Sequence, residues 1–169
     1  MKKYNIILTI LSFLLLSNCA LYEPQYRDKK TSYAVTDSSR IEKTFYLIGD
    51  AGYASLGEST PGLLAFEKYL KAHPQQGNYA IFLGDNIYPD GMPEKDAVDR
   101  PLAEHRLDAQ IESVNSFDGQ VIFIPGNHDW YNEGLKGLKR EENYFESKLK
   151  DRKVFRPAKG CPIETIDIT

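Results

Sequence analysis

Histidine and cysteine are scarce in this sequence, and basic residues are not in excess. Three histidines among 169 residues are few for a hydrolytic metal enzyme, which limits how complete a metal site the chain can hold. A formal net charge of −3 leaves no broad basic surface of the kind that binds nucleic acid, so we expect no nucleic-acid partner. The hydrophobic content of 41% nevertheless fits a single domain large enough to bury a sizeable core.

The amino terminus lacks a hydrophobic run long enough to span a bilayer comfortably. Residues 6–16 are largely apolar, whereas a membrane-spanning helix needs roughly 20 such residues. Lys2 and Lys3 precede this run. A basic start followed by a short apolar core is typical of an export signal, and we therefore predict a signal peptide over residues 1–18.

Only two cysteines are present, and Cys19 directly follows the predicted signal. A cysteine at that place resembles the bacterial lipobox, whose cysteine is acylated and becomes the new amino terminus. The resemblance implies an exported bacterial lipoprotein, anchored in the membrane by the lipid on Cys19 and facing the periplasm or the cell surface. An ordinary secretory signal cut near Ala20, or an uncleaved anchor, is the alternative. If Cys19 is acylated, Cys161 is expected as a buried free thiol or as half of a disulfide whose other cysteine is missing.

The polar residues 19–42 show no helical or strand periodicity, which predicts a tether between the membrane and a folded region that begins near Lys43. From there apolar runs alternate with helix-start signals, which favours an α/β fold with a mostly parallel sheet. The sequence stops within the last predicted strand, so we expect residues 43–169 to be a truncated domain. The mixed charges of residues 136–142 are expected on a solvated helix face. The predicted strands span residues 44–48, 79–83, 121–124 and 163–168, and the predicted helices span residues 61–73, 101–114 and 139–150.

Each of the first three predicted strands ends in a glycine that is followed by a residue able to ligate a metal. The motifs are Gly-Asp-Ala-Gly at 49–52, Gly-Asp-Asn-Ile-Tyr at 84–88 and Gly-Asn-His-Asp at 126–129. Parallel strands lie about 4.8 Å apart, so the loops that leave one edge of the sheet converge within reach of each other's side chains. We therefore expect one crevice to collect the side chains of Asp50, Asp85, Tyr88, Asn127 and His128.

Carboxylate, amide and phenolate oxygens suit hard or borderline divalent and trivalent metals. Two such ions about 3.5–4 Å apart need a bridging carboxylate and serve phosphoryl transfer. Asp85, on the middle loop, is the natural bridge. Taken singly, each aspartate is typical of a turn and Tyr88 of a packing residue, but three motifs in order after three strands favour a site.

This ordered set of motifs resembles the calcineurin-like metallophosphoesterases. Within that superfamily it is most similar to the purple acid phosphatase branch, whose pattern is GDxG, GDxxY and GNH. Gly52 stands where the general superfamily has a histidine, and Tyr88 matches the phenolate ligand of the branch. The resemblance implies a layered α/β/β/α sandwich, of which residues 43–169 would form the amino-terminal half, so the parallel sheet here would be one incomplete half.

The resemblance also implies roles for individual residues. Asp50 and Tyr88 would hold the first metal, Asp85 would bridge both metals, and Asn127 would bind the second. His128 would stabilise the transition state and protonate the leaving alkoxide, with Asp129 orienting it, while a metal-bound hydroxide attacks the phosphate ester. The implied substrate is a small phosphate ester or a phosphoprotein, and the implied metal pair is iron with iron, zinc or manganese.

The family pattern also contains two later histidine motifs, VxxH and GHxH, which this chain does not supply. His73 and His105 both precede the third motif and are expected as helix or surface residues. The chain therefore holds half of a metal site and is expected to have little activity by itself. A non-catalytic surface lipoprotein that keeps the phosphoesterase fold as a binding module is the competing hypothesis, and coding sequence beyond Thr169 would separate the two.

Overall fold

A computed structural model of the chain describes residues 41–73, 76–150, 154–158 and 163–168. The chain divides into two units, residues 1–38 and 39–169, and every described residue belongs to the second. The predicted signal peptide, Cys19, nearly all of the predicted tether and Cys161 lie outside the described residues. Within the described ranges, no helix is both long enough and apolar enough to cross a membrane.

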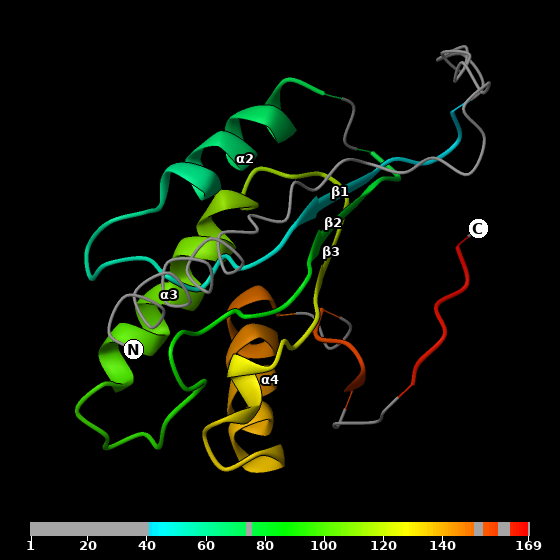
Figure 1. Ribbon diagram of the computed structural model, residues 1–169. Helices are drawn as coiled ribbons and strands as arrows, with labels where there is room; N and C mark the ends of the chain where they lie inside the picture. Colours follow the sequence, from blue (N-terminus) through cyan, green and yellow to red (C-terminus); the bar gives the residue numbers. More distant parts are fainter. Residues whose placement is uncertain (1–40, 74–75, 151–153, 159–162, 169) are drawn as a thin grey trace, which may run out of the picture. The chain divides into compact units, whose positions relative to one another are not determined.

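Three parallel strands form the sheet, in the order β1–β2–β3 (Figure 1). They span Phe45–Ile48, Tyr79–Phe82 and Gln120–Phe123. The central strand β2 is buried along almost its whole length, as expected of a parallel strand with neighbours on both edges. The prediction of an α/β fold with a parallel sheet is confirmed, and the first three predicted strands agree with the observed ones to within a residue at each end.

Among the described residues, three α-helices accompany the strands: α2 (Pro61–Lys71), α3 (Arg100–Ser113) and α4 (Leu135–Leu149). Helix α2 begins as its sequence predicts, because the Thr60 side chain accepts a hydrogen bond from the Leu63 amide at 3.2 Å and proline occupies the first turn. Helix α4 begins four residues before its predicted start. The prediction relied on apolar residues in the second half of α4, whereas the helix already begins at Leu135 and buries Leu138 in its first turn.

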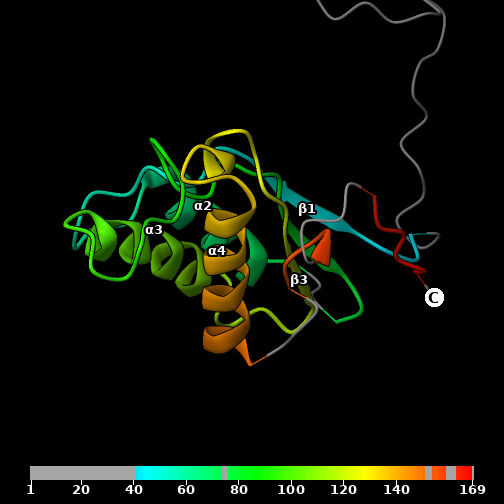
Figure 2. The same cartoon turned by 90° about the horizontal axis from the view of Figure 1, so that it is seen from below.

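The helices lie together on one side of the sheet, where the core is (Figure 2). Phe82 of β2 stacks on Phe123 of β3 with ring centroids 4.4 Å apart, and Phe123 stacks in turn on Phe145 of α4 at 3.8 Å. All three rings are fully buried, and burial of one such side chain contributes roughly 1.5–3 kcal/mol. The opposite face of β1 exposes Phe45 and Leu47, as the alternation of side chains along a strand requires.

The predicted fourth strand at residues 163–168 is wrong, because these residues have no regular secondary structure. The end of the free edge of β3 is bridged instead by Phe155. The Phe123 amide donates to the Val154 carbonyl at 2.6 Å, and the Arg156 amide donates to the Phe123 carbonyl at 2.8 Å. Since this bridge uses the hydrogen-bonding groups of Phe123, that end of β3 is not open to residues 163–168.

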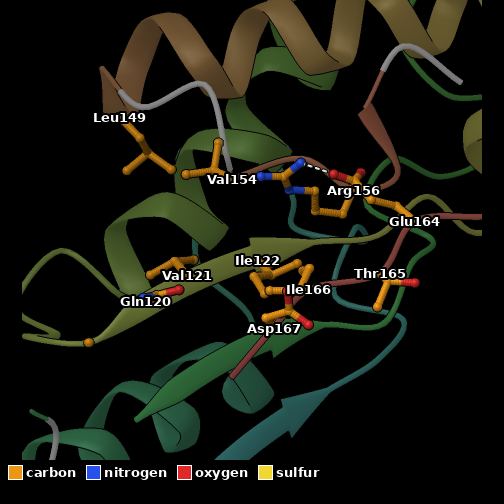
Figure 3. A pocket seen from close by; sticks show the side chains of 11 residues that line it. Gln120, Val121, Ile122, Leu149, Val154, Arg156, Glu164, Thr165, Ile166 and Asp167 are labelled. Carbon is orange, nitrogen blue, oxygen red and sulfur yellow. Dashed lines mark hydrogen bonds and ion pairs between the residues drawn. The ribbon is translucent and has the colours of Figure 1, made fainter. Parts of the chain in front are cut away.

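A cavity of about 590 Å³ separates β3 from residues 164–167 (Figure 3). Arg156 and Glu164 form an ion pair at its wall. None of the predicted site residues lines this cavity. The chemistry that the motifs predict therefore has to be sought at the carboxyl ends of the strands.

Candidate metal centre

The loops that follow β1 and β2 are joined by backbone hydrogen bonds. The Asp50 amide donates to the Gly84 carbonyl at 3.2 Å, and the Gly52 amide donates to the Asp85 carbonyl at 3.0 Å. The Tyr88 amide then donates back to the Gly52 carbonyl at 3.1 Å. These bonds fix the first two motifs against each other, as the convergence of parallel strands predicts.

Glycines allow this approach because a side chain would not fit. A Cβ atom at Gly126 would lie 2.2 Å from the Asp85 carboxylate, and one at Gly84 would lie 2.5 Å from the Gly126 nitrogen. Asp50 and Asp85 themselves have φ angles of +54° and +55°, a left-handed conformation that costs energy in any residue other than glycine. Glycine would adopt this backbone conformation at a lower energy. The presence of aspartate at both positions therefore indicates that the two carboxylates have a function.

Three oxygen atoms from the first two motifs converge. The Tyr88 hydroxyl lies 2.6 Å from Asp50 Oδ1 and 2.9 Å from Asp85 Oδ2. A hydroxyl has one hydrogen, so the two carboxylates share a single proton. The hydrogen bond to Asp50 is the main cause that raises the pKa of Tyr88 above its ordinary value, with burial and Asp85 adding to it.

The third motif joins this cluster through a short 3₁₀ helix, η2 (His128–Trp130). The His128 amide donates to Asp85 Oδ1 at 3.1 Å, and the His128 ring lies 4.3 Å from the Tyr88 ring between centroids. The Nδ1 atom of His128 bonds to the Pro89 carbonyl, which can only accept. The proton therefore resides on Nδ1, and Nε2 remains to exchange a proton.

Asn127 and Asp129 flank His128 and have different surroundings. The Asn127 amide nitrogen donates to the Tyr131 hydroxyl at 2.8 Å. Asp129 is fully buried and accepts from the backbone amides of Gly126 at 2.7 Å and Ile87 at 3.0 Å. Burial raises the pKa of Asp129 to about 6, although these hydrogen bonds oppose the shift. Its carboxylate binds backbone of two loops and not the His128 ring, so the predicted orienting role, which stays a prediction, would act through the backbone.

The donor set at this cluster fits a hard cation. Two carboxylates and a phenol already meet around one proton, and a cation could take the place of that proton. In the part of the chain that the structure describes, no group of three or more histidine, cysteine, aspartate or glutamate residues could hold a metal. His73 and His105 lie elsewhere: the His73 ring bonds to the Tyr69 carbonyl, and the His105 ring contacts Gly57.

A model of the calcineurin-like phosphoesterase family matches residues 43–165, which include all three motifs. The chain belongs to the calcineurin-like phosphoesterase family. Its members are metal-dependent phosphoesterases and generally use divalent metal ions. The superfamily that the motifs predicted is thereby confirmed, and the α/β fold with its parallel sheet agrees with a part of the metallophosphoesterase fold. Comparisons with curated proteins and with solved structures found no match.

Sequence reasoning missed a buried polar network behind the site of this calcineurin-like phosphoesterase. The Asn86 side chain donates to the Ile124 carbonyl at 2.9 Å and to Glu141 Oε1 at 3.0 Å, and Gln110 donates to the Asn86 carbonyl at 2.8 Å. Asn86, Gln110 and Glu141 are all fully buried. Burial, followed by the charge of Asp129, raises the pKa of Glu141 well above its ordinary value.

The prediction of a solvated face for the charged residues of 136–142 is wrong for part of them, although Lys136 and Lys139 are exposed as expected. Glu141 and Glu142 are both buried. A signal was present in the sequence, because Glu141 lies three residues after Leu138 and four before Phe145, which places it on the apolar face of α4. The prediction followed the charges of these residues and did not use the helical spacing of Glu141 from Leu138 and Phe145.

Proposed function

We propose that this calcineurin-like phosphoesterase hydrolyses phosphate esters at a dinuclear metal centre of the purple acid phosphatase type. The observation that carries the proposal is the meeting of the Asp50, Asp85 and Tyr88 oxygens around one proton, beside the His128 ring. Iron paired with iron, zinc or manganese suits a site with a phenolate ligand. The substrate would be a small phosphate ester or a phosphoprotein.

The residues of the chain have separate parts in this reaction. When bound, the metal ions would polarise the phosphoryl group and activate water. Asp50, Asp85 and Tyr88 would hold the ions from the first two loops, and Asn127 from the third. Asp85 is suited to bridge them, since its Oδ2 faces Tyr88 and its Oδ1 accepts from the His128 amide.

His128 would supply the proton for the leaving oxygen. Its Nδ1 is engaged by the Pro89 carbonyl, which fixes the ring and keeps Nε2 for proton exchange. The ring packs at 4.3 Å from Tyr88, so it stands next to the proposed metal ligands. Asp129 would help by holding the loop that carries His128.

Gly52 supports the assignment to the purple acid phosphatase branch. A Cβ atom at position 52 would lie 2.2 Å from the Asn86 backbone carbon and 2.5 Å from the Asp85 carbonyl oxygen. No side chain fits there without moving the second motif. A histidine ligand at this position, as in the general superfamily pattern, is therefore sterically incompatible with the loop, which leaves a role for Tyr88.

The test is metal analysis and a phosphatase assay on the full-length protein. We expect Asp85→Asn and His128→Ala each to lower turnover at least 100-fold, because one disturbs the bridging carboxylate and the other removes the proton donor. Asp85→Asn should also lower the bound metal, whereas His128→Ala should leave it nearly unchanged. Turnover close to wild type in both variants would show that these roles are wrong.

A non-catalytic binding module is the second candidate function. The observation that favours it is the lack of a three-membered histidine, cysteine, aspartate or glutamate cluster among the described residues. If the protein is such a module, the purified full-length protein would contain no bound metal and would show no phosphatase turnover. For either function we propose export and anchoring through a lipid on Cys19, supported by the basic and apolar residues that precede it.

A further inference from the structure

Asn86, the residue after the proposed bridging aspartate, is held by buried hydrogen bonds. Its backbone amide donates to Asp129 Oδ2 at 3.2 Å, and its carbonyl accepts from the Gln110 side chain at 2.8 Å. Its side-chain nitrogen donates to the Ile124 carbonyl at 2.9 Å and to Glu141 Oε1 at 3.0 Å. Of the polar atoms of Asn86, Oδ1 is left without a partner in the described part of the chain.

The Ile124 carbonyl fixes the orientation of the Asn86 side chain. A carbonyl can only accept, so the nitrogen of Asn86 and not its oxygen must face Ile124. The two hydrogens of that nitrogen serve the two nearest acceptors, the Ile124 carbonyl and Glu141 Oε1, while Asp129 Oδ2 lies farther away at 3.4 Å. Asn86 Oδ1 therefore needs a hydrogen from another group.

Glu141 has an oxygen in the same position on the other side of this hydrogen bond. Its side chain is fully buried, and its second oxygen, Oε2, has no partner among the described residues. Lys139, two residues earlier on α4, pairs with Glu142 at 2.9 Å. Arg140 pairs with Glu133 at 2.8 Å. A negative charge on Glu141 would thus be buried without a cation, which is costly, so the neutral acid with a hydrogen to donate is favoured.

We propose that Glu141 is a positioning residue, which as a neutral acid donates from Oε2 to Asn86 Oδ1 and so closes a ring of two hydrogen bonds between acid and amide. The ring gives a partner to two of the three buried side-chain oxygens that lack one among the described residues, the third being Gln110 Oε1. Burial and the charge of Asp129 raise the pKa of Glu141, in agreement with a neutral acid.

The ring would connect helix α4 to the loops that carry the proposed metal ligands. Asp85 directly precedes Asn86, so the position of Asn86 determines where the Asp85 carboxylate lies. Asn86 also bonds to Ile124, at the start of the third loop. The ring itself follows from the buried contacts, whereas its effect on metal binding rests on the proposed function.

Infrared spectroscopy of the full-length protein at pH 7 tests the neutral acid directly. We expect a difference spectrum of wild type minus Glu141→Gln to contain the carbonyl band of a protonated carboxylic acid. Asp129, with a pKa of about 6, is mostly ionised at this pH. Glu146→Gln, at a half-buried position of the same helix, is the matched control and should keep the band. A difference spectrum without the band would overturn the inference.

The affinity of the metal-free full-length protein for Zn²⁺, measured by calorimetry, tests the positioning role. Glutamine can accept with its oxygen and donate with its nitrogen, so Glu141→Gln keeps the ring and should bind Zn²⁺ within twofold of wild type. Glu141→Met fills the space without either group, and we expect it to bind about tenfold more weakly. Glu146→Met is the matched control and should change nothing.

The two measurements separate this inference from the proposed function. A tenfold loss in Glu141→Gln would show that a charged carboxylate is needed and would overturn the ring, even if Glu141→Met does not fold. Equal affinity in all variants would overturn the positioning role and leave the proposed function standing. A wild-type protein that binds no metal would overturn the proposed function, whereas the infrared difference spectrum would still decide the ring.

Discussion

The proposed metal centre depends most on three residues, namely Tyr88 and the two aspartates that share its proton. The Tyr88 hydroxyl is the only group that both carboxylates contact within hydrogen-bonding distance in the described site. Asp50 and Asp85 reach it from backbone with positive φ, which is uncommon outside glycine although aspartate adopts it more often than most residues. The motifs identified these residues, but nothing in the sequence indicated their strained backbone.

Replacement of Tyr88 tests the phenolate ligand directly. Tyr88→Phe keeps the ring and its contact with His128 but removes the oxygen, so we expect at least tenfold weaker metal binding. If the bound metal is ferric iron, the variant should also lose the visible absorption that a tyrosinate–iron bond produces. Tyr69→Phe, at an exposed tyrosine of α2, is the control and should alter neither property. Unchanged absorption in Tyr88→Phe would exclude Tyr88 as a ligand.

Gly52 gives a second prediction at this scale. The Cβ atom of Gly52→Ala would lie 2.2 Å from the Asn86 backbone, so the two loops must separate, and we expect a loss of about 2–4 kcal/mol in the free energy of unfolding. Gly62→Ala in α2 is the control, since its Cβ meets nothing closer than 3.8 Å and alanine favours a helix. Urea denaturation of both variants would measure the difference. Equal midpoints would mean that the first loop adapts freely.

At the scale of elements, helix α4 supports the site from behind through Glu141. Burial raises the pKa of Glu141 well above the unfolded value, so the folded protein binds a proton that the unfolded chain releases as the pH rises. Asp129, whose pKa is raised to about 6, acts in the same direction. The stability contributed by these protonated groups is therefore present at pH 4 and declines as the pH rises through their folded pKa values.

Replacement of Glu141 by glutamine tests whether the stability of the fold decreases as the pH rises. Glu141→Gln mimics the protonated acid, so we expect it to match wild type near pH 4.5 and to be more stable by about 1–3 kcal/mol at pH 8. Urea midpoints at the two pH values measure the effect. Glu146→Gln, at a half-buried position of the same helix, should leave the pH dependence unchanged. A Glu141→Gln variant that is less stable than wild type at pH 8 would contradict the assignment of a neutral Glu141.

The elements also show what the sequence could predict and why. The first three strands were predictable because each is a short apolar run closed by glycine, and α2 because Thr60 and Pro61 mark its start. The prediction of a strand at 163–168 failed because the alternation of apolar residues does not show whether a neighbouring strand has a free edge to pair with. The raised pKa of Glu141 was not predictable either, because its causes are burial and the charge of Asp129, which lies 12 residues earlier in the chain.

At the scale of the whole molecule, strand order explains why Asp85 is the proposed bridge. In the order β1–β2–β3, the loop after β2 lies between the other two. Its Asp85 can therefore contact Tyr88 and the first motif on one side and the His128 amide on the other. A site assembled from three loops about 40 residues apart forms only when the sheet is complete, so metal binding and folding of the sheet should be coupled.

The proposed membrane anchoring would depend on Cys19, which precedes the described residues in the sequence. If Cys19 is acylated, Cys19→Ser should abolish incorporation of labelled fatty acid and move the protein from the membrane fraction to the soluble fraction of cells. Cys161→Ser is the matched control, because it removes the other cysteine and should leave labelling intact. Membrane association that persists without labelling in Cys19→Ser would favour the uncleaved anchor. Wild-type protein that is soluble and unlabelled would favour an ordinary secretory signal cut near Ala20, because such a protein keeps neither a lipid nor an apolar anchor.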